Sequence, residues 1–265
     1  MTAPHLLTIA RDIALAAADL ADRRRREGVE VAASKSSPED VVTHADRETE
    51  QLIRSMIADA RPDDGFYGEE SGAETGTSGL TWIVDPIDGT VNYLYDIPHW
   101  AVSVAVVEGE PDPLTWTALA GAVVNPRAGE VYSAALGAGS YLGERRLAVA
   151  ETELPLALVG TGFSYSASRR VEQARDLVGL VERVRDIRRM GTASLDLCAV
   201  AAGRLNAYFE EGLKPWDHAA GALIAAEAGA TVTGRDGATA GGEFLLAAPP
   251  QLALHLEEAL SAIHR

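Results

Sequence analysis

The chain has 265 residues, of which 47% are hydrophobic and 23% charged, and its formal net charge is −16. A chain of this length can bury a sizeable core, as one large α/β domain or two packed halves. It contains no run of about 18 apolar residues, so no membrane span is expected, and its acidic balance disfavours nucleic-acid binding. The N-terminal segment lacks the order of a secretory signal, and the single Cys198 is predicted to be a reduced core residue, so we expect a cytoplasmic protein.

Hydrophobic periodicity predicts two helices at the start of the chain. Apolar residues recur at helical spacing across residues 4–28, and a second helix is predicted over residues 44–60. Thr43 is expected at the N-cap of the second helix, with Asp46 three residues later as in a shortened capping box.

Short apolar runs rich in β-branched residues then predict four strands, at residues 81–85, 100–107, 115–124 and 130–134. Turns are expected at residues 109–113 and 137–143. The later elements are predicted to be strands at 157–162, 206–210 and 244–248, and helices at 168–185, 193–203, 216–229 and 249–263. This order favours an α/β (α+β) fold of alternating helix and sheet layers, with an N-terminal half (1–150) and a C-terminal half (151–265) in one compact unit.

The segment 82–92 carries the strongest chemical signal. A hydrophobic strand leads into Asp85, Pro86 is expected to end the ladder and turn the chain, and Asp88 follows three residues later. Two carboxylates on a tight turn can converge on one point, and Gly89 lets the backbone approach a ligand closely. If a helix begins there, its first amides form an anion site. In isolation, such a turn more often has Asp side chains that cap their own backbone.

Three further segments are weak evidence for a functional site when each is considered alone. Adjacent glutamates such as Glu69 and Glu70 are usually solvated. The loop 35–46 has the composition of a turn and a helix cap, and Asp217 could be the N-cap of an apolar helix.

Together, and in this order, the segments resemble the inositol monophosphatase family. The family's Asp-Pro-Ile-Asp-Gly-Thr motif stands intact, with Trp before it and Asn after it. The other matching motifs are Gly-Glu-Glu, a Lys-x-x-x-x-Asp…Thr-x-x-Asp loop, Gly-Thr-Ala and Trp-Asp. The five motifs lie at residues 82–92, 68–70, 35–46, 191–193 and 216–217. Tyr93, where Phe is usual, and a slightly longer turn at 109–114 are the departures.

The resemblance implies an αβαβα sandwich of the inositol monophosphatase and fructose-1,6-bisphosphatase type, and hydrolysis of a phosphomonoester by metal-activated water. An oxygen-only ligand set favours Mg²⁺, two or three ions per site, or Mn²⁺, over zinc. The implied ligands are Glu69, Asp85, the Ile87 carbonyl, Asp88 and Asp217, and the implied catalytic groups are Glu69, Thr90 and Asp46. Substrate would contact Asp88, Gly89, Thr90, Gly191, Thr192, Ala193 and Glu210, with Lys35 and Glu70 in supporting positions. Lithium sensitivity and a homodimer are also implied.

Several alternatives remain open at this point. The residue Glu210 and the sequence at 90–93 favour myo-inositol-1-phosphate as the substrate, whereas Glu211 is assigned to solvent. Histidinol phosphate, fructose 1,6-bisphosphate and a nucleotide 3′-phosphate require the same metal core. A non-catalytic regulatory protein is a further hypothesis, although such a protein should have lost at least one ligand. His44 and His218 flank site residues, and both are expected to serve in packing or support.

Overall fold

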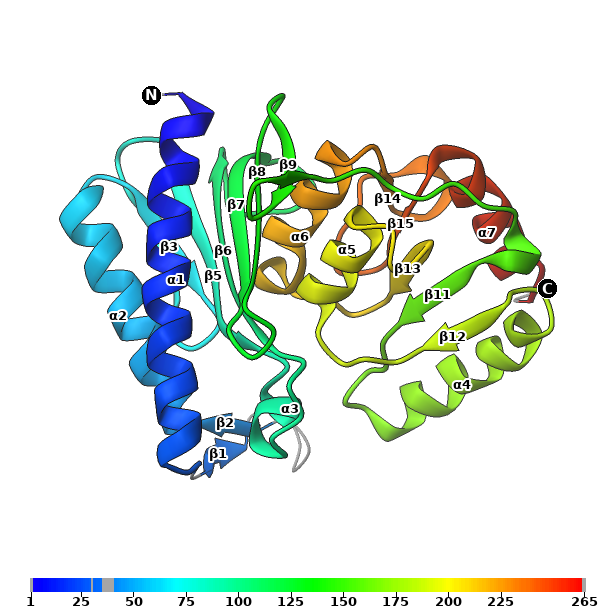
Figure 1. Cartoon of the computed structure of the whole chain (residues 1–265), viewed down its shortest axis with the longest axis horizontal. Coiled ribbons are helices and arrows are strands. Elements are labelled where there is room, and N and C mark those ends of the chain that lie inside the picture. Colours follow the sequence, from blue (N-terminus) through cyan, green and yellow to red (C-terminus); the bar gives the residue numbers. More distant parts are fainter. Residues whose placement is uncertain (1, 30, 35–40, 264–265) are drawn as a thin grey trace.

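The structure is a computed structural model that describes residues 2–29, 31–34 and 41–263 of the chain. Figure 1 shows its elements as stacked layers, with helices α1 and α2 at one end and a large sheet beside them. Helices α5 and α6 follow, then a smaller sheet, and helices α4 and α7 lie on the outer side of that sheet. The predicted layer order of an αβαβα sandwich is therefore confirmed. None of the helices in the described ranges is long and apolar enough to cross a membrane.

The large sheet has eight strands in the order β10-β9-β8-β7-β6-β5-β3-β4, and all of its pairs are antiparallel except β3–β5. The first part of the chain contains these elements: α1 (Ala3–Glu27), β1 (Val31–Ser34), β2 (Val41–Thr43), α2 (His44–Ala60), β3 (Gly65–Gly68), β4 (Gly72–Glu74), β5 (Leu80–Asp88), α3 (Thr90–Leu94), β6 (Ala101–Glu108), β7 (Thr117–Asn125), β8 (Glu130–Ala135), β9 (Gly139–Leu142) and β10 (Arg145–Arg146).

The smaller sheet has the order β12-β11-β13-β15-β14, with parallel pairs around β11 and antiparallel pairs around β15. The elements of this part are η1 (Leu154–Leu156), β11 (Leu158–Thr161), α4 (Ala167–Val181), β12 (Asp186–Arg188), α5 (Ala193–Ala201), β13 (Ala207–Glu210), α6 (Pro215–Glu227), β14 (Thr231–Thr233), η2 (Arg235–Gly237), β15 (Leu245–Ala248) and α7 (Pro250–Ile263). The boundary between two halves near residue 150 stays a prediction.

Alternation along the strands explains why both sheets are covered on two sides. Trp82 and Val84 on β5 pack in the core with α1 and α2, whereas Ile83 between them packs in the core with α5 and α6. In the smaller sheet, Phe209 faces α4 and α7, and Tyr208 faces α5 and α6. The middle helices therefore have apolar neighbours on both sides, and they carry few charged residues.

One glycine sets how closely the middle layer approaches the large sheet. A Cβ atom on Gly121 of β7 would lie 2.9 Å from Ala220 Cα of α6. Real Cβ atoms do not approach another carbon so closely, so any larger residue would push α6 away from the sheet. The distance between α6 and the large sheet therefore depends on this contact.

The structure corrects several predicted elements. The strand predicted at 81–85 runs on through Pro86 to Asp88, because an irregularity in the β5–β6 register accommodates the proline. The region 137–143, predicted to be a turn, contains strand β9, which pairs with β8. The helix predicted over 168–185 ends at Val181, and the short strand β12 follows it.

Candidate active site

All the residues predicted from the sequence to bind metal or substrate line one cavity of about 450 Å³, whereas Asp46 and Glu70 do not line it. The end of β5, the turn after β3, and the N-termini of α5 and α6 meet there, together with the end of β13 and the segment after β11. The walls include Glu69, Asp85, Ile87, Asp88, Gly89, Thr90, Gly191, Thr192, Ala193, Glu210, Glu211 and Asp217. Lys35 lies outside the described residues.

Asp85 and Asp88 are both buried at the end of β5. Asp85 Oδ1 accepts from the Ile87 amide at 3.0 Å, so the irregular segment of the strand folds around this carboxylate. Asp88 Oδ2 accepts from the Ser194 amide at 2.8 Å, at the start of α5. The two carboxylates are thus fixed by different elements and face the same cavity.

Thr90 begins the short helix α3 after Gly89, whose φ of +93° is a left-handed conformation that favours glycine. Thr90 Oγ1 lies 3.4 Å from Asp46 Oδ1 and 3.1 Å from the Ile87 carbonyl oxygen. The other carboxylate oxygen of Asp46 accepts from the Thr43 amide at 2.8 Å, which confirms the predicted capping box at α2. Asp46 therefore joins the helix start to the threonine hydroxyl.

Glu69 and Glu70 lie on the turn after β3. The Glu69 amide donates to the Val84 carbonyl at 3.2 Å, and the Glu70 amide donates to Glu50 Oε2 at 2.8 Å. Glu50 is a buried residue of α2. The turn that presents Glu69 to the cavity is therefore tied both to β5 and to α2.

Asp217 is not the N-cap residue of α6. Lys214 occupies that position, and Asp217 sits in the first turn, where its Oδ2 accepts from the Lys214 amide at 2.6 Å. A carboxylate in the first turn of a helix is stabilised by the helix dipole. This arrangement holds the side chain at the cavity wall from the middle layer of the fold.

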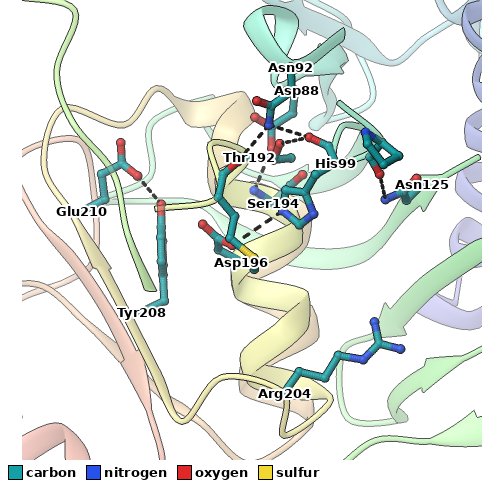
Figure 2. A network of polar contacts seen from close by, with 12 residues as sticks. Asp88, Asn92, His99, Asn125, Thr192, Ser194, Asp196, Arg204, Tyr208 and Glu210 are labelled. Carbon is teal, nitrogen blue, oxygen red and sulfur yellow. Dashed lines mark hydrogen bonds and ion pairs between the residues drawn. The ribbon is translucent and has the colours of Figure 1, made fainter. Parts of the chain in front are cut away.

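The segment 190–194 is bound to the α3 region by several hydrogen bonds, which Figure 2 shows together with the Asp88–Ser194 contact. Thr192 Oγ1 donates to the His99 carbonyl at 2.8 Å, and Asn92 Nδ2 donates to the same oxygen at 2.7 Å. A Cβ atom on Gly89 would overlap Thr192 Oγ1. Glycine at this position therefore allows the two segments that are predicted to bind substrate to approach each other.

The two neighbouring glutamates at the end of β13 have different surroundings. Glu210 accepts from Tyr208 Oη at 2.5 Å, as Figure 2 shows. The assignment of Glu211 to solvent is wrong, because its half-buried carboxylate pairs with Arg169 and Arg235. Glu211 therefore fastens the start of α4 and the η2 turn to the cavity wall.

The cavity gathers carboxyl groups whose pKa values rise because of burial and mutual repulsion. Burial, followed by the charges of Glu69, Asp88 and Asp217, raises the pKa of Asp85 well above its usual value. Burial raises the pKa of Asp88 to about 7, against the opposing hydrogen bonds from Ser194. Burial and the charges of Asp88 and Glu69 raise the pKa of Asp217 as well. Such a group of carboxylates favours a bound cation, since a cation removes the repulsion.

The same physical causes act on the two groups beside the acidic cluster. Burial raises the pKa of Asp46 to about 7, and the charges of Glu69 and Glu70 add to this effect. Burial also raises the pKa of Glu210 to about 7, while Tyr208 and Arg189 oppose the increase.

The donor chemistry of the cluster fits a hard divalent cation. Its carboxylates and the Ile87 carbonyl supply only oxygen ligands, which Mg²⁺ and Mn²⁺ accept and which zinc prefers less than His and Cys. In the described ranges, no three His, Cys, Asp or Glu side chains stand in an arrangement that could hold a metal ion. The fit therefore rests on the type of ligand and on the mutual repulsion, and metal binding stays a prediction.

The two flanking histidines differ. His218 is buried beside the Trp116 ring, with a centroid separation of 6.0 Å, and burial lowers its pKa to about 4. His44 is exposed at the start of α2. Cys198 is buried in α5, as predicted.

Sequence reasoning missed four residues that support the site, namely Glu50, Asn92, Ser194 and Tyr208. Glu50 lies on an amphipathic helix, where a glutamate is usually exposed. Ser194 acts through its main-chain amide, which leaves no signature in the residue type. The hydrogen-bond partners of Asn92 and Tyr208 are set by tertiary contacts and by the alternation of side chains along β13, which the residue types alone do not indicate.

Comparison with known proteins is consistent with this geometry. A model of the inositol monophosphatase family matches residues 3–264. The protein named inositol-1-monophosphatase SuhB from Mycobacterium tuberculosis (strain ATCC 25618 / H37Rv) is 44% identical, covering 98% of this chain and 94% of that protein. The crystal structure of extragenic suppressor protein suhB from Bartonella henselae has a TM-score of 0.88 and 34% identity, covering 97% of this chain and 98% of that one.

A further relative has a different kind of name. A protein from Xylella fastidiosa (strain Temecula1 / ATCC 700964) is named Nus factor SuhB, and it is 41% identical, covering 76% of this chain and 71% of that protein. The match of the family model over nearly the whole chain is independent of these names. The chain therefore belongs to the inositol monophosphatase family.

Proposed function

We propose that this protein is a Mg²⁺-dependent phosphatase of small polyol phosphates and that myo-inositol-1-phosphate is its preferred substrate. The observation that carries the proposal is the convergence of Glu69, Asp85, Asp88 and Asp217 on one cavity, from strand β5, helix α6 and the turn after β3. A phosphate dianion would be repelled by such a cluster alone, so the cluster indicates a cation-assisted reaction.

Bound Mg²⁺, held by Glu69, Asp85, the Ile87 carbonyl, Asp88 and Asp217, would neutralise the phosphate and lower the pKa of water. The protein's own groups would orient the reactants. Thr90 Oγ1, which lies within reach of Asp46, would orient the attacking water, and the first amides of α3 would bind the phosphate. Glu70 would act through its charge on Asp46.

The alcohol part of the substrate would lie against Glu210 and the segment 191–193. Glu210 presents a carboxylate, which accepts hydrogen bonds from hydroxyl groups of a polyol ring. Histidinol phosphate and fructose 1,6-bisphosphate are alternatives with the same hydrolytic groups. We further propose that the enzyme acts in the cytoplasm as a homodimer, so its sedimentation mass should be about twice the 28.0 kDa of one chain. A mass near one chain at micromolar concentration would contradict the dimer.

The test is phosphate release from a panel of phosphomonoesters, with Mg²⁺ and with excess EDTA. We expect release from inositol-1-phosphate with Mg²⁺ and none in EDTA. Asp85→Asn should nearly abolish turnover, because this buried carboxylate lies among Glu69, Asp88 and Asp217 and is proposed to hold cations with them. Full turnover in EDTA would exclude the metal mechanism.

The name of the Xylella relative favours one second candidate, a regulatory role through binding to another macromolecule. All the acidic residues predicted to bind metal line the same cavity in this protein. A purely regulatory protein would not need such a set of carboxylates. Absence of phosphate release from every substrate in the panel, with Mg²⁺ present, would favour this candidate over the enzyme.

A further inference from the structure

Two groups that are not part of the proposed hydrolysis restrain the carboxylate of Glu210. The first is Tyr208, whose hydroxyl donates to Glu210 Oε2 at 2.5 Å. Residues 208 and 210 are two apart on strand β13, so their side chains emerge from the same face of the sheet. Figure 2 shows the Tyr208 hydroxyl pointing at the Glu210 carboxylate.

Tyr208 is itself rigidly placed. Its side chain is fully buried in the core between the smaller sheet and the middle helices. A buried tyrosine hydroxyl requires a hydrogen-bond partner, and Glu210 supplies it here. The ring therefore carries a fixed donor from the core to the cavity wall.

The second restraint is Gly162, which directly follows β11, the parallel neighbour of β13. A Cβ atom on Gly162 would overlap the Glu210 carboxylate. The φ angle of Gly162 is not positive, so the backbone conformation does not itself require glycine. The missing side chain leaves the space that the carboxylate occupies.

We propose that Tyr208 and Gly162 are positioning residues that fix the Glu210 carboxylate for recognition of the substrate's alcohol part. The inference rests on the proposed function, in which Glu210 accepts hydrogen bonds from substrate hydroxyls. A carboxylate already held in one place loses little freedom when the substrate binds. The site would therefore favour a rigid ring that carries hydroxyl groups over a short flexible alcohol such as glycerol.

The experiment compares Tyr208→Phe and Gly162→Ala with the wild-type protein on inositol-1-phosphate and glycerol-2-phosphate, in Mg²⁺. In each variant, the KM for inositol-1-phosphate should rise about five- to tenfold, in line with the loss of one ordinary hydrogen bond. The KM for glycerol-2-phosphate and both kcat values should stay within about twofold, since the metal ligands are untouched. Equal increases in both KM values would overturn the proposal.

A matched control is Tyr132→Phe. The side chain of Tyr132 is also buried, and its hydroxyl donates to Glu130 Oε2 at 2.8 Å, but it does not line the cavity. This variant loses the same kind of contact and should keep both KM values. The same KM pattern in Tyr132→Phe as in Tyr208→Phe would assign the effect to general loosening of the fold.

A double variant separates positioning from a structural role. In a Glu210→Ala background, the further change Tyr208→Phe should not raise the KM for inositol-1-phosphate, because the carboxylate that it positions is gone. An additional increase of the same size in that background would overturn the proposal.

Crystal structures of Tyr208→Phe and Gly162→Ala test the positioning of the Glu210 carboxylate even if the protein proves not to be a phosphatase. No phosphate release by the wild-type protein from any substrate would refute the enzyme but not the positioning. The Glu210 carboxylate should be displaced in both variants, and a carboxylate unmoved in both would overturn the positioning role.

Discussion

The stability of the protein should depend on pH through Glu210, and Glu210→Gln should remove that dependence. Burial raises the pKa of Glu210 from 4.5 to about 7, despite the hydrogen bond from Tyr208 and the charge of Arg189. The folded chain therefore holds this proton more tightly than the unfolded chain does. The contribution to stability is complete below pH of about 4.5 and is lost as the pH rises through about 7.

The size of the effect follows from these two pKa values. Their difference of about 2.5 is equivalent to at most about 3 kcal/mol, of which about 2.5 kcal/mol should be lost between pH 5 and 8. This value is an upper limit because the side chain keeps some exposure at the cavity. For a chain of this size, 1 kcal/mol shifts the melting temperature by about 2–4 °C. The wild-type protein should therefore lose about 5–10 °C relative to Glu210→Gln over that pH range.

The assay is thermal unfolding of both proteins at pH 5 and pH 8, in EDTA so that bound cations do not contribute. The other titrating groups are present in both proteins, so the difference between the two proteins reports Glu210 together with its charge interactions with Asp88, Asp196 and Asp217. Glutamine still accepts a hydrogen bond from Tyr208, and any remaining difference in packing does not change with pH. Melting temperatures that change in parallel for the two proteins would refute the reasoning.

Three further predictions concern other parts of the molecule. Lithium should inhibit turnover uncompetitively, and Asp217→Ala should weaken both lithium inhibition and magnesium activation in steady-state kinetics. Lithium inhibition of the Asp217→Ala variant as strong as that of the wild-type protein would contradict the proposed role of Asp217. Glu211→Gln should lower the free energy of unfolding by about 1–2 kcal/mol, because the ion pairs of Glu211 with Arg169 and Arg235 are lost. The variant should keep its turnover of glycerol-2-phosphate, and an unchanged free energy of unfolding would contradict the prediction. Gly121→Val should lower the free energy of unfolding by about 2 kcal/mol or more in denaturant unfolding, because β7 contacts α6 at this glycine. An unchanged free energy of unfolding would show that α6 can move away from the sheet.

Local pattern was sufficient for much of the fold. Long amphipathic helices and the four longest strands of the large sheet, β5 to β8, were predicted because their hydrophobic pattern extends over many residues. Strands β3, β12 and β14, of three or four residues each, were not predicted, since so short a segment becomes a strand through its neighbours in the sheet. The glycine-rich sequence at β9 indicated a turn, and pairing with β8 overrode that preference.

The acidic residues of the site could be predicted because their order along the chain resembles a known family. Their supports could not, because they act across long sequence separations. Ser194 meets Asp88 through a main-chain amide 106 residues away, and Glu211 finds its two arginines on separate elements. When two glutamates are adjacent in the sequence, as Glu210 and Glu211 are, the local sequence does not indicate which side chain points to solvent.

The layer order distributes two kinds of chemistry over two sheets. The carboxylates proposed to hold cations come mainly from the large sheet and from α6, whereas Glu210 ends strand β13 of the smaller sheet and Gly162 directly follows its strand β11. If Glu210 binds the alcohol part of the substrate as proposed, substitutions along β11 and β13 should change which alcohol is accepted while the proposed cation ligands stay in place. On the same proposal, a protein engineer who seeks a new alcohol specificity could confine the substitutions to these two strands and leave the large sheet unchanged.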